Sequence, residues 1–224
     1  RDVSYARYMF RIASNITQDI SSFTISNVSE AQEMFQGAHD ISQNIGTLDI
    51  SNVDDARYMF RDVSGLTQDI SSFTIQNVER AEWMFHTAHD INQNIGTLDI
   101  SGVSDAYSMF ASVYNVTQDI GTFTIRDISN AYEMFYQAHD INQNIGTLDI
   151  SGVSDAYQMF YNANNITQDI SSFTISNVTN ADNMFSDASN ITQDIGTFTI
   201  RDVSYARYMF QDVSGLTQDI SSFT

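Results

Sequence analysis

The chain has 224 residues, of which 42% are hydrophobic, so it is long and apolar enough to build a core rather than stay disordered. It carries 28 acidic residues against nine arginines, and the net charge of −19 excludes the basic surface that a nucleic-acid-binding protein needs. Cysteine is absent, which excludes disulfides and thiolate metal sites, and no apolar run is long enough for this segment to insert directly into a membrane.

The sequence repeats every 25 residues without insertion or deletion. Nine copies run from Arg1 to Thr224, and the ninth stops one residue short. Such regularity is typical of a solenoid, in which neighbouring coils must match in length. We therefore predict one domain, 1–224, built as an α/β repeat solenoid of nine coils without evident capping repeats. Residues at the same place in successive repeats are called a column here, and columns are numbered from Arg1.

The first predicted element of each repeat is a short helix. In the first repeat, apolar residues from Val3 to Ala13 recur with spacings of 3, 3, 1 and 3, which places them on one helical face. Ser4 is a suitable N-cap, and Asn15 stands where a left-handed residue would end the helix. We predict a helix of about nine or ten residues, with the methionines and phenylalanines of its columns in the core.

The second half of each repeat predicts one or two short strands. In the first repeat they are 16–20 and 23–25, with a Ser-Ser or Gly-Thr corner between them. Because all coils run in the same sense, the strands would be parallel, on one side of the coil, with the helices on the other. This arrangement is leucine-rich-repeat-like. Helices need about 10 Å between axes and strands about 4.8 Å, so we expect modest curvature.

One glutamine column is unbroken through all nine repeats and lies among apolar columns. Stacked amides can hydrogen-bond to one another along the axis, so the column predicts an inward-facing structural ladder. A polar stripe that binds a ligand is the alternative. The ladder consists of Gln18, Gln43, Gln68, Gln93, Gln118, Gln143, Gln168, Gln193 and Gln218.

The next column alternates acid and amide, as in Asp19 and Asn44, and column 24 alternates in the opposite phase, as in Thr24 and Asp49. Alternation doubles the distance between stacked carboxylates and so lowers their repulsion. Three aspartates at the end break the rule: Asp169, Asp194 and Asp219. We interpret them as solvated, with Ca²⁺ binding as the weaker alternative, and we expect no other cofactor or metal.

Histidine recurs every 50 residues as His39, His89 and His139, each followed by an aspartate. A catalytic His-Asp pair needs a nucleophile and oxyanion donors around it, and three identical copies along a rod do not form one pocket. We interpret these histidines as structural residues at the C-terminal end of the predicted helix, near the negative end of its dipole. The sequence predicts no catalytic residue, and we expect that the protein is not an enzyme.

Tyrosine, tryptophan and arginine gather in the variable positions of the first element. Tyrosine and arginine favour interfaces, so these positions predict a contact surface, and packing between neighbouring helices is the equal alternative. The candidate residues are Arg7, Tyr8, Arg11, Arg57, Tyr58, Arg61, Trp83, Tyr107, Tyr132, Tyr136, Tyr157 and Tyr161.

Threonine recurs in the columns of Thr17, Thr24 and Thr47. A regular face of threonine, aspartate and glutamine is therefore an alternative function, as a ligand- or ice-binding solenoid. Aspartate residues such as Asp49 interrupt one of these columns, which disfavours the flat array that ice binding needs.

The repeat resembles a known family in three segments: 167–172 (Thr-Gln-Asp-Ile-Ser-Ser), 176–179 (Ser-Asn-Val-Thr) and Met184–Phe185. They are similar to the BspA-like, leucine-rich-repeat-related bacterial surface protein repeat first noted in mycoplasma surface lipoproteins. This sequence departs from the pattern where Phe23 or Leu48 replaces a tryptophan and Ala6 replaces a methionine. The resemblance implies an extracellular or cell-surface protein with an adhesive or structural role and no enzymatic activity.

The first and last repeats carry the same apolar columns as internal ones, and the ten residues that start at Arg1 recur whole from Arg201. A free-standing solenoid needs polar terminal repeats, because its end coils otherwise expose core residues. We therefore expect a longer array or filament, through self-association or continuation of the chain, with a host or matrix surface as a further possible partner.

Overall fold

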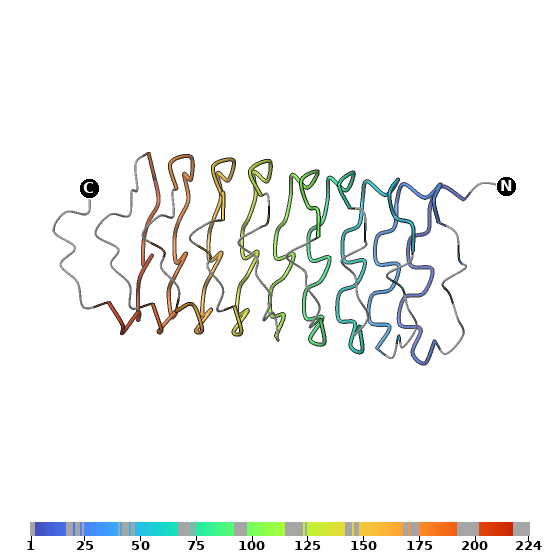
Figure 1. The fold of residues 1–224 in the computed structure, drawn as a ribbon, viewed down its shortest axis with the longest axis horizontal. Helices are drawn as coiled ribbons and strands as arrows, with labels where there is room; N and C mark the ends of the chain where they lie inside the picture. Colours follow the sequence, from blue (N-terminus) through green and yellow to red (C-terminus); the bar gives the residue numbers. More distant parts are fainter. Residues whose placement is uncertain are drawn as a thin grey trace.

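The computed structural model describes residues 3–16, 20, 23, 25–39, 41, 45, 48–66, 73, 75–91, 98–114, 123, 125–141, 145, 148–167, 170, 175–191 and 202–216. Their segments lie side by side along one long axis, with 3–16 near one end and 202–216 near the other (Figure 1). Isolated parallel bridges join column 5 of each repeat to column 5 of the next, from Tyr5–Glu30 to Asn180–Tyr205. The described segments therefore stack with a register of one 25-residue repeat per coil.

The prediction of a helix in the first half of each repeat is wrong. The described segments contain turns there and no α-helix. Two columns have left-handed backbone in every repeat, beginning with Tyr8 (φ 61°) and Ile12 (φ 57°) and ending with Tyr208 (φ 58°) and Asp212 (φ 56°). An α-helix requires φ near −63° at every residue, so a left-handed residue in each of these columns excludes it.

Hydrogen bonds between coils explain this backbone. The amides of columns 6, 8, 10 and 12 donate to the next coil, as Tyr8 N–H does to the Gln32 carbonyl at 3.1 Å. The amides of columns 9, 11 and 13 donate within the coil, as Met9 N–H does to the Ala6 carbonyl at 3.3 Å. A helix would direct all these amides along its own axis, whereas the left-handed residues turn alternate amides towards the neighbouring coil.

The amide of column 7 remains, and an asparagine or aspartate in column 5 accepts its hydrogen bond where such a residue is present. Its side-chain oxygen accepts the amide of the residue two positions later, for example from Tyr107 to Asp105 at 3.1 Å and from Tyr157 to Asp155 at 3.0 Å. Such Asx turns compete with helix formation because they give the backbone another partner.

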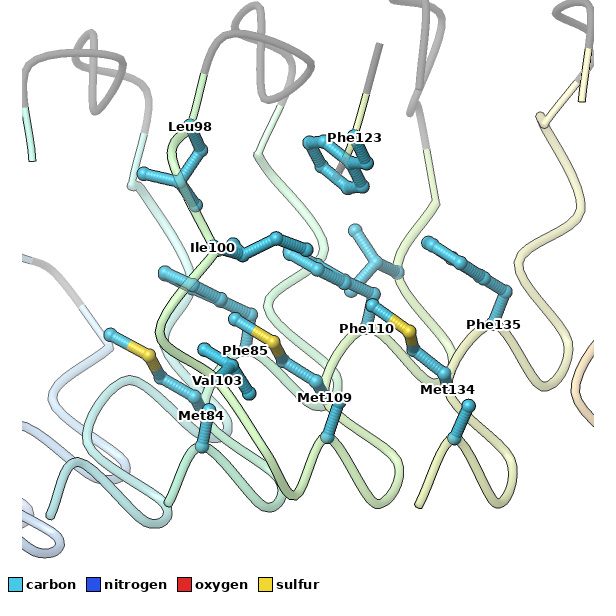
Figure 2. Close-up of a cluster of buried hydrophobic side chains, with 14 of the residues drawn as sticks. Met84, Phe85, Leu98, Ile100, Val103, Met109, Phe110, Phe123, Met134 and Phe135 are labelled. Atoms are coloured by element: carbon cyan, nitrogen blue, oxygen red, sulfur yellow. The ribbon is translucent and has the colours of Figure 1, made fainter. Parts of the chain in front are cut away.

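The core lies inside the coils, and the prediction that the methionine and phenylalanine columns form it is confirmed for the internal coils. Met109 and Phe110 are fully buried, and Figure 2 shows them aligned with the equivalent side chains of neighbouring coils. From Phe10 to Phe210 each column-10 ring stacks on the next, with centroids 5.2 to 5.7 Å apart and planes within 3 to 9° of parallel. This spacing lies within the favourable range for aromatic pairs.

The expected curvature rested on packed helices that need more space than strands. The described turn segments are linked by hydrogen bonds and contain no packed helices, so this reason for curvature does not hold. The predicted strands at 16–20 and 23–25, and their equivalents, lie largely outside the described residues. The strand side of a leucine-rich-repeat-like solenoid therefore stays a prediction.

Candidate functional site: the aromatic face

The predicted contact-surface residues all lie in the described turn segments. They occupy columns 7, 8 and 11, between the buried columns of the core. The same hydrogen-bonded backbone recurs in each coil, so side chains of one column are held one coil apart. The face formed by columns 5, 7, 8 and 11 is called the aromatic face below.

Five aromatic side chains form a continuous ladder along this face. Tyr58 stacks on Trp83 with centroids 4.8 Å apart, and Trp83 contacts Tyr107 at 4.4 Å. Tyr107, Tyr132 and Tyr157 continue the ladder at 4.6 and 4.5 Å. The rings therefore pack between neighbouring coils, as the alternative interpretation expected of helices, while their edges remain partly exposed. Their use as a contact surface stays a prediction. A shorter stack, Tyr136 on Tyr161 at 5.1 Å, runs in column 11.

Two tyrosines in the middle of the ladder have a raised pKa. Burial raises the pKa of both Tyr107 and Tyr132, and the charge of Glu133 raises it further. The Glu133 carboxylate in turn accepts a hydrogen bond from Ser108 Oγ at 3.0 Å. The middle of the aromatic face therefore presents these two protonated phenol groups next to the Glu133 carboxylate.

A buried carboxylate organises the other half of the face. Asp55 is fully buried, and it accepts hydrogen bonds from Arg57 Nε at 2.9 Å, from Arg57 Nη2 at 2.8 Å and from Gln32 Nε2. Arg80 Nη1 lies 3.1 Å from the same carboxylate. Burial by itself would raise the pKa of Asp55, but the hydrogen bonds from Arg57 and Gln32 outweigh it and lower the pKa. The same hydrogen bond raises the pKa of Arg57.

The two predicted groups at Arg7 and Arg57 flank a pocket of about 230 Å³. Gln32, which also lines this pocket, is 7% exposed, and its Oε1 atom is buried without a hydrogen-bond partner. The pocket is lined by Arg7, Tyr8, Gln32, Glu33, Arg57 and Tyr58. A second opening, of about 420 Å³, is lined by Arg11, Ile12, Gln36, Gly37, His39 and Asp62.

The interpretation of the recurring histidines as helix-end residues is wrong, because no helix ends there. His89 and His139 instead stack on the two sides of Tyr114, with centroids 4.8 and 5.4 Å away. His39 lines the second opening, and its carbonyl accepts a hydrogen bond from Ser64 Oγ at 2.7 Å.

Several predicted sites lie outside the described residues. These are the glutamine ladder, the three candidate Ca²⁺ ligands Asp169, Asp194 and Asp219, and the threonines Thr17, Thr24 and Thr47. Within the described ranges, no cluster of three or more histidine, aspartate or glutamate side chains is arranged to hold a metal ion.

Sequence reasoning missed the roles of Asp55, Gln32 and Arg80. A signal was present, because column 5 is polar in most repeats although it lies between the apolar columns 3 and 6. An aspartate between two apolar columns is a candidate for a buried, paired carboxylate.

The stacked segments and the ladders that link them define a repeat protein. The sequence belongs to the family described as "Mycoplasma protein of unknown function, DUF285", which matches three overlapping stretches, 4–123, 59–173 and 129–224. Comparisons with curated proteins and with solved structures gave no match. Among the described residues, no helix has the length and apolar character that crossing a membrane requires.

Proposed function

We propose that the protein is a non-catalytic structural or adhesive scaffold of a cell surface, fibre or filament, and that it acts outside the cell. The observation that carries the proposal is the five-ring ladder from Tyr58 to Tyr157, which is held on a backbone that repeats from coil to coil. Partly exposed tyrosine and tryptophan edges supply contact area at a low cost in side-chain entropy.

The variation along the face supports the same role. The core columns hardly change between repeats, whereas column 7 holds arginine, glutamine, glutamate, tyrosine or aspartate. A constant frame that carries variable exposed side chains is the usual arrangement of repeat proteins that bind partners along a surface. The resemblance to BspA-like surface repeats supports the extracellular location.

Self-association is part of this proposal. In the first described coil, Val3 is 50% exposed and Met9 is 43% exposed, whereas the same columns are fully buried in internal coils such as that of Val103 and Met109. A coil of a second molecule would cover these side chains and accept the same hydrogen-bond register.

The adhesive role is tested by binding of the purified protein to cultured host cells and to immobilised extracellular-matrix proteins. The triple change Tyr107→Ser, Tyr132→Ser and Tyr157→Ser should reduce binding at least tenfold, because it removes three central rings. A matched triple change at another corner of the coil, Ser51→Ala, Ser101→Ala and Ser151→Ala, should leave binding unchanged. Equal binding by both variants, with folding verified by thermal melts, would contradict the proposal.

A further inference from the structure

We propose that the pocket between Tyr8 and Tyr58 binds a neutral, flat aromatic ring with an N–H donor on its edge, as in an indole group. The ring would take the place of a missing rung in the aromatic ladder. This inference concerns a binding site and does not depend on the adhesive role proposed above.

The missing rung follows from column 8. Tyr8, Glu33 and Tyr58 occupy this column in three successive coils, and their φ angles of 61, 54 and 58° show the same backbone conformation. The change of side chain at Glu33 therefore interrupts the column of rings. In the core alongside, Phe10, Phe35 and Phe60 are separated by steps of 5.2 and 5.5 Å, so Tyr8 and Tyr58 are two such steps apart.

A gap of two coils suits one inserted ring. Rings in the ladder lie 4.4 to 4.8 Å apart, so a ring midway between Tyr8 and Tyr58 would contact both at a normal stacking distance. Arginines hold both tyrosines in the same way, with Arg11 over Tyr8 at 5.8 Å and Arg61 over Tyr58 at 5.6 Å. The two rings are therefore preorganised as the walls of the gap.

The charges around the pocket are already paired, which favours a neutral ligand. Arg7 forms an ion pair with Glu30, and Arg57 forms one with Asp55 at 2.8 Å. Glu33 pairs with the guanidinium of Arg11 at 3.0 Å. A charged ligand would have to replace one of these partners and would gain little from the exchange.

Gln32, in the lining of the pocket, has a buried acceptor atom that lacks a hydrogen-bond donor. Gln32 Nε2 donates to Asp55 and, at 3.5 Å, to Glu30, so both hydrogen-bonded partners lie on the amide nitrogen side. The Oε1 atom is left as a buried acceptor without a partner. A buried unpaired acceptor is costly, and an N–H group on the edge of the inserted ring would satisfy it.

The volume limits the size of the ligand. Drug-sized molecules occupy pockets of about 300–1,000 Å³, and this pocket of about 230 Å³ is smaller. It therefore takes a single ring system, and the rest of the ligand would extend into solvent beside the exposed Tyr8.

The test is calorimetric titration of the full chain with N-acetyl-L-tryptophanamide, for which we expect a Kd on the order of 1 mM. Glu33→Tyr should supply the missing rung and weaken binding at least tenfold, while Gln158→Tyr, a ring added to column 8 beside an occupied rung, should leave the Kd unchanged. Unchanged affinity in a folded Glu33→Tyr variant would overturn the proposal.

The hydrogen bond is tested with a second probe, in which the indole nitrogen carries a methyl group. This probe should bind about tenfold more weakly to the natural chain, and Gln32→Met should abolish the difference between the two probes. Equal binding of both probes to the natural chain, or tighter binding of N-acetyl-L-argininamide, would show that the site does not select a neutral donor ring.

The source of the ring is distinguished by placing the same tryptophan inside a glycine-flanked peptide. Binding at least as tight as that of the free probe assigns the site to a partner polypeptide. Tenfold weaker binding of the peptide assigns it to a free small molecule.

Discussion

Replacing Gln158 by glycine should stabilise the protein, because this residue lies in the left-handed region with φ 51°. A non-glycine residue in that region costs about 1–2 kcal/mol, and glycine removes the cost. Glycine also gives the unfolded chain more conformational freedom, which lowers the free energy of unfolding by about 0.4–1 kcal/mol. We expect a net gain of about 0.8 kcal/mol, or about 2–3 °C in Tm.

The matched control is Gln36→Gly, which makes the same chemical change in column 11. Gln36 does not adopt a left-handed conformation, and its Oε1 atom accepts a hydrogen bond from Arg11 at 3.0 Å. Glycine should therefore lower the stability of this variant by about 0.5–1 kcal/mol.

Both variants are measured by equilibrium urea unfolding, followed by circular dichroism and by the fluorescence of the lone tryptophan. The left-handed turns predict shifts of opposite sign for the two variants. A helix would make both variants less stable, by about 1 kcal/mol each. Two equal losses of stability would therefore refute the reasoning.

Glu82→Gln should raise stability at pH 7, because burial raises the pKa of Glu82 and its buried Oε2 atom has no hydrogen-bond partner. The natural chain loses stability as pH rises above the ordinary value of 4.5 towards the raised pKa, so the gain should vanish in melts below pH 4.5. The double change Gln93→Leu and Gln118→Leu should lower the free energy of unfolding by more than about 1 kcal/mol if the glutamines form a ladder, and an unchanged urea midpoint would contradict it. EDTA should leave Tm unchanged, whereas a fall that Ca²⁺ reverses would assign an ion to the three terminal aspartates of column 19.

The core could be predicted from the sequence, but the backbone that carries it could not. The spacing of apolar residues from Val3 to Ala13 fits a helical face, and it also fits a chain of tight turns whose apolar side chains point inward. The deciding hydrogen bonds join residues 24 positions apart, such as Phe10 N–H to the Met34 carbonyl at 2.8 Å. Local periodicity carries no information about such contacts.

A local signal against the helix was nevertheless present. Aspartate or asparagine stands in column 5 at Asp55, Asp105 and Asn130, next to the apolar columns. These residues favour turns because their side chains accept backbone amides, and Asn130 accepts that of Tyr132 at 3.1 Å.

The residues of the aromatic face could be predicted from the sequence, but their full geometry could not. Tyr107, Tyr132 and Tyr157 share a column, so a stack could be expected from the repeat alone. The ladder then crosses from column 7 to column 8 between Tyr107 and Trp83, which are 24 rather than 25 residues apart. Only the shape of the turn brings columns 7 and 8 together. Alignment of the repeats keeps the two columns separate, so it could not predict this contact.

The register of 25 residues per coil is tested most directly by disulfide trapping, because the natural chain has no cysteine. Asp155 and Asn180 form a parallel bridge, with their side chains 3.1 Å apart, so Asp155→Cys with Asn180→Cys should form an intramolecular disulfide under mild oxidation. Asp155→Cys with Tyr205→Cys spans two coils and exceeds the roughly 7 Å limit between Cα atoms, so this pair should stay reduced. Equal trapping of both pairs, or of neither, would contradict the stacked-coil account.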